Sequence, residues 1–191
     1  MSAILLIHGF GGGRWEYQIL ARAFHRQGVK TYQFTYQEKF GSVSLVKIAE
    51  KLASYMEKRR NEEKIVTVGL SQGGIIAAYW LEFLGGKKYC QCCWTICTPF
   101  SGSLLSYLLP LPGLVELRPE SSLLQSLKQA MAKSSVNYLG IWNPLDLFVF
   151  PGTSARAPGQ KSSYPVLAPS HPLTFWMPRT IKLICQEVRK N

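Results

Sequence analysis

The chain has 191 residues, a length that suits one domain, residues 1–191, built around a single large core. Apolar residues make up 47% of the sequence and aromatic residues 12%, a composition that excludes an intrinsically disordered chain. No apolar run is long enough to span a bilayer as a helix.

The formal charge of +11 favours one of two roles, solubility or attraction to an anionic surface. Short basic clusters occur at residues 58–60, 87–88 and 189–190, and no aromatic residues are interleaved with them. That arrangement is not typical of proteins that bind nucleic acid. We therefore expect no nucleic-acid partner, and an anionic membrane surface is the candidate partner if the charge is functional. The sequence does not indicate an oligomeric state.

The cysteines are odd in number, and four of the five crowd onto one strand-like run, which makes a poor disulfide framework. Their spacing matches no familiar zinc pattern. We expect all five to be buried free thiols in a reducing compartment: Cys90, Cys92, Cys93, Cys97 and Cys185. No metal and no cofactor are predicted. Because the first residues lack a basic region, a cytoplasmic location is expected, with membrane association or a secreted mature form as alternatives.

Strand-like and helix-like segments alternate along the chain. Short runs rich in apolar, β-branched or aromatic residues predict strands at residues 3–7, 29–36, 64–68, 89–96 and 136–142, with a weaker one at 164–167. Helical spacing predicts helices at residues 14–27, 43–60, 74–84 and 173–188, the last interrupted near Pro178. This alternation predicts an α/β fold of three layers around a mainly parallel sheet of about six strands.

Residues 103–118 are strongly apolar but are broken by Pro110, Pro112 and Gly113. One interpretation is a buried segment that crosses the core. The other is a partly exposed apolar flap, since the segment follows the end of a sheet strand, where ligands bind in such folds.

The turn after the third predicted strand carries the motif Gly69-Leu70-Ser71-Gln72-Gly73. Strand, sharp turn and helix are the context in which a G-x-S-x-G motif exposes a nucleophilic serine. Glycine at 69 and 73 removes side chains that would collide across the turn. Ser71 is therefore the predicted nucleophile, at a helix N-terminus that favours negative charge.

A serine hydroxyl needs a neighbouring base, and the chain has three histidines. His171 lies in a loop before the last predicted helix and downstream of Ser71, where the base of this arrangement belongs. His25 lies among surface-type residues of the first helix, and His8 lies before the nucleophile. We therefore predict His171 as the base.

The base in turn needs a carboxylate that holds its tautomer. Asp146 is the single aspartate of the chain and follows the fifth predicted strand. It lies between Ser71 and His171, which gives one of the known chain orders of such triads. Glu116 and Glu120 are the alternative acids.

Hydrogen-bond donors for a developing oxyanion are predicted at two backbone positions. One is the N–H of Gln72, and the other is the N–H of Phe10 in the glycine-rich loop after the first strand. His8 and Gly9 are predicted to support that loop.

These motifs together resemble the α/β-hydrolase family and, more closely, its small bacterial lipases and esterases. The similar segments are residues 7–12, 69–73, 98–103, 144–149 and 170–171. The resemblance implies a sheet that starts at the family's third strand and ester hydrolysis through an acyl-enzyme, without a cofactor. It also implies a lid at residues 103–118. Leu70, where lipases often have histidine, and Ser170, where glycine is frequent, depart from the lipase pattern.

The predicted function is a lipase or carboxylesterase that acts on a lipid or another acyl ester. An acyl-thioesterase or acyltransferase with the same triad is the alternative within enzymes. A non-catalytic protein that binds lipid or a membrane surface on the same scaffold is the alternative from another class.

Overall fold

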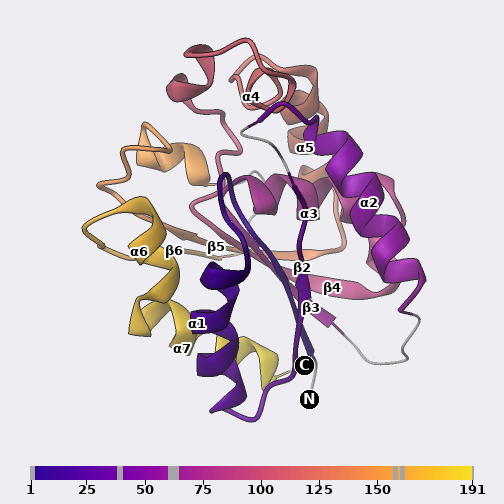
Figure 1. The fold of residues 1–191 in the computed structure, drawn as a ribbon, viewed down its shortest axis with the longest axis vertical. Coiled ribbons are helices and arrows are strands. Elements are labelled where there is room, and N and C mark those ends of the chain that lie inside the picture. The colour runs from indigo at the N-terminus through magenta and orange to yellow at the C-terminus, as the bar shows by residue number, and fades with distance from the viewer. Residues whose placement is uncertain (1–2, 38–40, 60–64, 157–158, 160–161, 191) are drawn as a thin grey trace.

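The computed structural model describes residues 3–37, 41–59, 65–156, 159 and 162–190. These residues form three layers, with one sheet between two groups of helices (Figure 1). The predicted α/β class and the three-layer arrangement are confirmed.

The sheet has six strands in the order β2-β1-β3-β4-β5-β6, and every neighbouring pair in it is parallel. The strands are β1 (Ala3–Ile7), β2 (Thr31–Phe34), β3 (Ile65–Leu70), β4 (Cys90–Ile96), β5 (Asn137–Trp142) and β6 (Ser162–Pro165). All residues of β1 and β3 are buried, as expected for central strands of a parallel sheet that is covered on both faces. Because all strands are parallel, their carboxyl ends share one edge of the sheet.

Each face of the sheet has its own group of helices and its own apolar cluster. On one face lie α2 (Leu45–Glu57), α3 (Gln72–Phe83) and α5 (Ser122–Ala132). On the other lie α1 (Arg14–His25), α6 (His171–Trp176) and α7 (Pro178–Val188). Short helical turns complete the chain at η1 (Gly86–Lys88), η2 (Leu104–Tyr107), α4 (Pro112–Val115) and η3 (Gly152–Ala155).

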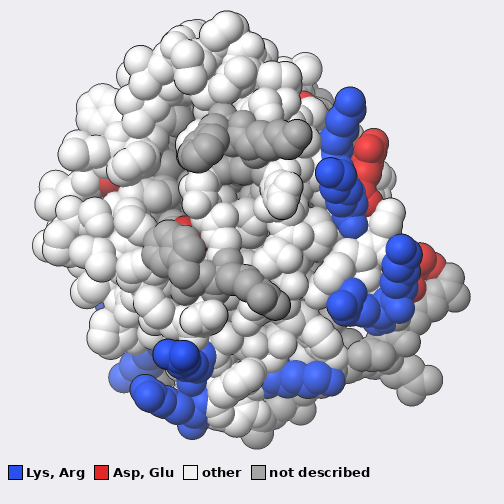
Figure 2. Space-filling model, viewed as in Figure 1, with Lys and Arg blue, Asp and Glu red and all other residues white. Residues whose placement is uncertain are grey.

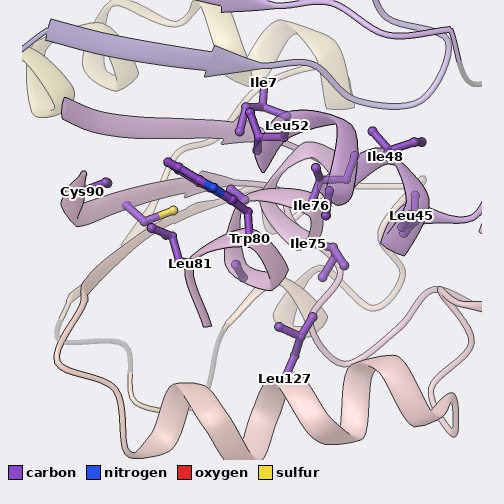
Figure 3. Close-up of a cluster of buried hydrophobic side chains, with 14 of the residues drawn as sticks. Ile7, Leu45, Ile48, Leu52, Ile75, Ile76, Trp80, Leu81, Cys90 and Leu127 are labelled. Atoms are coloured by element: carbon purple, nitrogen blue, oxygen red, sulfur yellow. The ribbon is translucent and has the colours of Figure 1, made fainter. Parts of the chain in front are cut away.

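The helix that follows the Ser71 turn is buried on nearly all sides. Figure 3 shows Ile75, Ile76 and Trp80 of α3 among side chains of α2, α5 and the sheet. Nine of its 12 residues are buried, and the three that are not, Tyr79, Glu82 and Phe83, lie in its second half. The start of α3 is therefore firmly held, and so is the turn before it.

Most predicted elements are present, with ends that differ by a few residues. The predicted strand 164–167 begins earlier, at Ser162, and the predicted closing helix is two helices that meet at Met177. Arg60 and Lys64, at the ends of a predicted helix and strand, lie outside the described residues. The helix α5 was not predicted, although Ser121 caps it by accepting the Leu124 N–H at 3.3 Å. In the part of the chain that the structure describes, no helix combines the length and apolarity needed to cross a membrane.

Candidate active site

The turn between β3 and α3 holds Ser71 in a strained backbone conformation. Ser71 has φ 53° and ψ −125°, a region that residues with a side chain rarely adopt. Its N–H donates to the carbonyl oxygen of Ile96 at 2.8 Å, which extends the pairing of β3 and β4 by one residue. Such conformations persist only where the surroundings fix them, and they cluster at functional sites.

Glycines line this turn because no side chain would fit. A Cβ on Gly69 would lie 2.5 Å from the Cα of Gly74, and a Cβ on Gly73 would lie 2.4 Å from the carbonyl oxygens of Ile7 and His8. A Cβ on Gly9 would lie 2.9 Å from the Cβ of Ser71. The loop after β1 therefore packs directly against the Ser71 turn.

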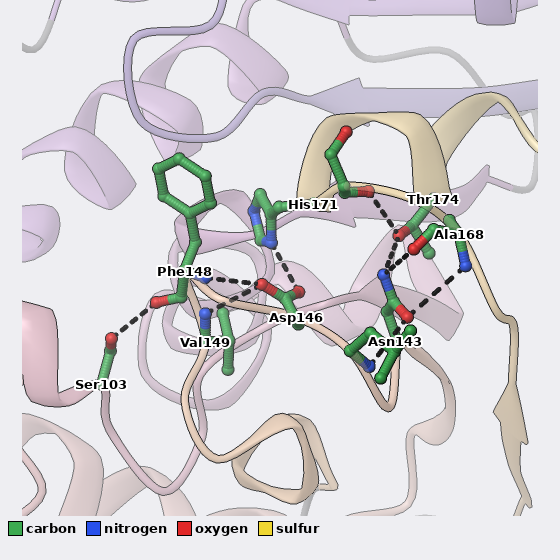
Figure 4. Close-up of polar contacts among 10 residues, drawn as sticks. Ser103, Asn143, Asp146, Phe148, Val149, Ala168, His171 and Thr174 are labelled. Atoms are coloured by element: carbon green, nitrogen blue, oxygen red, sulfur yellow. Dashed lines mark hydrogen bonds and ion pairs between the residues drawn. The ribbon is translucent and has the colours of Figure 1, made fainter.

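Asp146 and His171 meet at the carboxyl edge of the sheet. Nδ1 of His171 lies 2.6 Å from Oδ2 of Asp146, and both side chains are largely buried (Figure 4). Burial raises the pKa of Asp146, but the hydrogen bond and charge of His171, together with the Val149 N–H and Cys97, hold the pKa below its ordinary value. The carboxylate is thus ionised at neutral pH and accepts the Nδ1 proton, which leaves Nε2 as the acceptor of the neutral ring.

The Asp146 carboxylate and the His171 ring are held on several sides. Oδ1 of Asp146 accepts the N–H groups of Phe148 at 2.9 Å and Val149 at 3.0 Å. The ring of His171 packs 5.4 Å from the ring of Phe148 and 5.3 Å from that of Phe175, measured between centroids. The orientation of both side chains is therefore set before any ligand arrives.

Asn143, which was not predicted as a site residue, joins the loop after β5 to the loop before α6. It is fully buried, and its Nδ2 donates to the carbonyl oxygen of Ala168 at 3.0 Å and to Oγ1 of Thr174 at 3.3 Å. Its Oδ1 accepts the Leu145 N–H at 3.1 Å (Figure 4). Asn143 thereby fixes the Asp146 loop relative to the His171 loop. Nothing near Asn143 in the sequence indicates this role, because Ala168 and Thr174 lie 25 and 31 residues away.

Ser71 and His171 line the same pocket, which has a volume of about 410 Å³. Gly9, Phe10 and Gln72 line it as well, so both positions predicted to donate to an oxyanion face the same space as Ser71. Within the described residues no hydrogen bond joins Ser71 to His171; catalytic hydrogen bonds often form only when substrate binds. Most of the remaining wall is apolar, and it includes Leu105, Leu108, Leu109, Leu114, Leu117, Val149 and Phe175.

The other two histidines lie elsewhere. His8 is buried, with Nδ1 2.8 Å from the Gly9 carbonyl oxygen and Nε2 3.3 Å from the Tyr36 nitrogen, and its ring stacks on that of Tyr36 at 3.9 Å. Burial lowers the pKa of His8, which keeps the ring neutral. These contacts suit the predicted support of the glycine loop. His25 is exposed on α1, near Thr31.

The two alternative acids are engaged away from His171. Glu116 accepts hydrogen bonds from Oγ of Ser44 at 2.6 Å and from the N–H of Leu45 at 2.5 Å, at the N-terminus of α2. Glu120 accepts the hydroxyl of Tyr107. The structure therefore brings Asp146, and neither glutamate, to the histidine.

All five cysteines are free and buried, as predicted. Cys97 lies beside the acid and the base: its Sγ, a carboxylate oxygen of Asp146 and a ring nitrogen of His171 are within 4.8 Å of one another. These are atom types that can bind a metal. However, the His171 nitrogen and the Asp146 oxygen already share a hydrogen bond, and burial together with the Asp146 charge raises the pKa of the Cys97 thiol. The cluster is therefore better suited to a chain of hydrogen bonds than to a metal centre.

No protein-family model and no curated protein sequence matches the chain, but solved structures do. The mature form of a Bacillus licheniformis lipase has a TM-score of 0.83 at 14% identity, over 98% of this chain and 91% of the other. Aspergillus fumigatus lipase B has a TM-score of 0.82 at 14% identity, over 98% of this chain and 52% of its own. This chain has the α/β-hydrolase fold. A metagenome-derived lipolytic enzyme also has this α/β-hydrolase architecture, with a TM-score of 0.69 at 15% identity, over 99% of this chain and 94% of the other. The predicted likeness to small lipases and esterases is thus confirmed at the level of fold.

Proposed function

We propose that this α/β-hydrolase is a serine hydrolase that cleaves carboxylic esters with apolar acyl groups. One observation carries the proposal: the strained Ser71 and His171 line one pocket, and Asp146 holds the far nitrogen of His171. These are the parts that turn a weak hydroxyl into a nucleophile.

The reaction would run through an acyl-enzyme. Oγ of Ser71 attacks the acyl carbon while Nε2 of His171 takes its proton, and Asp146 stabilises the charged ring. The backbone N–H groups of Phe10 and Gln72 donate to the oxyanion. His171 then gives the proton to the departing alcohol. Water attacks the acyl-enzyme by the same route, releases the acid and restores Ser71.

The apolar wall of the pocket supports an acyl chain as the part of the substrate that is bound. Leucines of residues 103–118 supply much of that wall. Because a buried CH₂ group contributes about 0.8 kcal/mol, longer acyl chains gain binding energy as long as the wall extends. The proposed substrate is thus a lipid or another acyl ester, and neither a cofactor nor a metal takes part in the proposed reaction.

Residues 103–118 are proposed to form a lid with a fixed base and an apolar tip. At the base, Oγ of Ser103 donates to the Phe148 carbonyl oxygen at 2.7 Å, and Glu116 holds the N-terminus of α2. At the tip, Leu108 is 73% exposed although it lines the pocket. The tip is therefore the part that would move when a substrate enters.

The surface near the pocket supports contact with lipid. Large apolar side chains that line the pocket are also exposed, among them Phe10, Leu105, Leu108, Leu109 and Phe148. Figure 2 shows Lys and Arg gathered on the side that carries α2 and at the end near the termini, whereas the end that carries α4 is largely free of them. An anionic membrane surface is retained as a proposed partner, to be tested with vesicles of defined charge.

Turnover of p-nitrophenyl esters from acetyl to palmitoyl, with the wild type and Ser71→Ala, tests the proposal. We expect hydrolysis by the wild type, and labelling of Ser71 by a fluorophosphonate that is lost in the variant. A folded wild type that is neither labelled nor active on any ester refutes the proposal.

Two further experiments distinguish the ester hydrolase from the alternative functions. Faster turnover of thioesters than of esters of equal chain length favours an acyl-thioesterase or acyltransferase. Binding to neutral or anionic vesicles without turnover favours a non-catalytic lipid-binding protein. Stronger binding to anionic than to neutral vesicles supports the anionic partner.

A further inference from the structure

Cys97 shares an unusual feature with Ser71. Among the described residues other than glycine, these two have a positive φ, 48° for Cys97 and 53° for Ser71. They are also neighbours in the sheet: Leu70 pairs with Ile96, and Ser71 and Cys97 follow directly. The N–H of Cys97 donates to the Ile141 carbonyl oxygen at 2.8 Å, so Cys97 extends the pairing of β4 with β5 by one residue, as Ser71 extends that of β3 with β4. Because strained residues of this kind cluster at functional sites, the conformation of Cys97 indicates a functional role.

The strained backbone directs the thiol into the contact between acid and base. Sγ of Cys97 lies within 4.8 Å of a carboxylate oxygen of Asp146 and of a ring nitrogen of His171. Asp146 follows β5 and His171 begins α6, so the thiol lies beside both segments that carry the acid and the base. The side chain is fully buried. Burial, followed by the nearby Asp146 charge, raises the pKa of Cys97, so the sulfur keeps its proton and can donate it in a hydrogen bond.

We propose that Cys97 is a positioning residue whose S–H group donates to the Asp146 carboxylate and thereby sets how strongly Asp146 holds the His171 ring. The inference rests on the proposed hydrolase function. The carboxylate then has three kinds of donor: Nδ1 of His171 on Oδ2, the two backbone N–H groups on Oδ1, and the proposed thiol.

The thiol has a predictable effect on the titration of the histidine. A donor to Asp146 spreads the carboxylate charge, which weakens its attraction for a protonated His171. Without that donor the charged ring is favoured, and the midpoint of the His171 titration moves to higher pH. The titratable groups that face this contact are Asp146 from the loop after β5, His171 from α6 and Cys97 itself. Glu16 of α1 lines the same pocket.

Three substitutions separate the effect of the thiol donor from the effect of the backbone strain at residue 97. Cys97→Ser keeps both a donor and the side chain that makes φ 48° unfavourable. Cys97→Ala keeps the strain and removes the donor. Cys97→Gly removes the donor and relieves the strain. Each is compared with the wild type in the pH profile of kcat/KM for a p-nitrophenyl ester, in thermal denaturation and in an NMR titration of the His171 ring.

We expect the Ala and Gly variants to lose about tenfold in kcat/KM, the order of effect of one hydrogen bond to a charged group. In both variants, the acid limb of the kcat/KM profile and the midpoint of the His171 NMR titration should shift to higher pH by the same amount. In the Ser variant the midpoint stays at or below that of the wild type. The Gly variant should melt at a higher temperature than the Ala variant, because the relief of strain outweighs the greater flexibility that glycine gives the unfolded chain.

If the midpoint of the His171 NMR titration is unchanged in both the Ala and the Gly variant, the inference is wrong, whatever happens to the melting temperature. Packing alone would then account for the buried thiol of Cys97. The NMR titration needs no turnover. If the wild type hydrolyses no ester, the proposed function fails, and the NMR arm still decides whether the thiol acts on the pair of Asp146 and His171.

Discussion

Replacing Ser71 by glycine should make the protein inactive and more stable. The serine has φ 53°, and a residue with a side chain in such a region costs about 1–3 kcal/mol. Glycine adopts this region without that cost, but it also makes the unfolded chain more flexible, which removes about 0.4–1 kcal/mol of stability. The Cβ of Ser71 packs close to Gly9, and losing its contacts removes less than about 0.8 kcal/mol, the value for a fully buried CH₂.

The net expectation is a gain of about 1 kcal/mol in the free energy of unfolding of Ser71→Gly relative to Ser71→Ala. The alanine variant is the matched control, because it lacks the hydroxyl and keeps the strained Cβ. For a protein of this size, about 1 kcal/mol corresponds to about 2–4 °C in Tm. The assay is thermal denaturation of wild type, Gly and Ala variants under identical conditions, together with ester turnover.

Neither variant should hydrolyse esters, and the Gly variant should have a higher Tm than the Ala variant. If the glycine variant melts at or below the alanine variant, the turn stores no strain at residue 71. The argument that the fold holds Ser71 in position for chemistry would then be wrong.

Four other perturbations test separate parts of the proposed site. Asp146→Asn should lower kcat by about 10⁴-fold with the fold retained by circular dichroism, because the histidine tautomer changes; near-normal turnover would transfer the acid role to another carboxylate. Leu108→Ser should lower the ratio of palmitoyl to acetyl ester turnover by about threefold or more, since its side chain lines the pocket; an unchanged ratio would remove Leu108 from the acyl site. Glu116→Gln should lower stability by about 1 kcal/mol in urea denaturation, because the charged cap of α2 is lost, and equal stability would contradict that role. Burial lowers the pKa of His8 in the folded protein below its ordinary value of 6.5, so on acidification the unfolded chain binds this proton first. The free energy of unfolding should therefore be fully retained above pH 6.5 and should fall as the pH drops from there through the pKa of folded His8. His8→Gln should make this fall smaller.

The parts of the fold that the sequence predicted depend on local patterns. The Ser71 turn could be found because glycines at fixed spacing, after an apolar strand, reflect contacts between residues that are close in sequence. The central strands were found because burial on both faces requires continuous apolar runs. The base and the acid followed from chain order, since the carboxyl ends of parallel strands meet at one edge. The assignment of their roles stays a prediction.

The parts that the sequence analysis missed depend on distant contacts. Cys97 was predicted only as a buried thiol, because nothing near it in sequence indicates a positive φ or a carboxylate neighbour. The role of Asn143 was not predicted, because Ala168 and Thr174 are far along the chain. The helix α5 was also not predicted, although Ser121 and the leucines at 123, 124 and 127 form a local helical pattern that indicates it.

The order of strands explains why the proposed site needs supporting residues. β3, β4, β5 and β6 are neighbours in both sequence and space, so Ser71, Cys97 and Asp146 follow successive strands, and His171 follows the fourth. The base therefore starts three strands away from the serine and reaches the shared pocket only because its loop folds back over the ends of β5 and β4. Asn143 holds that loop at β5, and the strained Cys97 lies beneath it at β4. A parallel sheet supplies the common edge, but the contacts made at the ends of the two intervening strands determine whether the histidine and the serine face the same space.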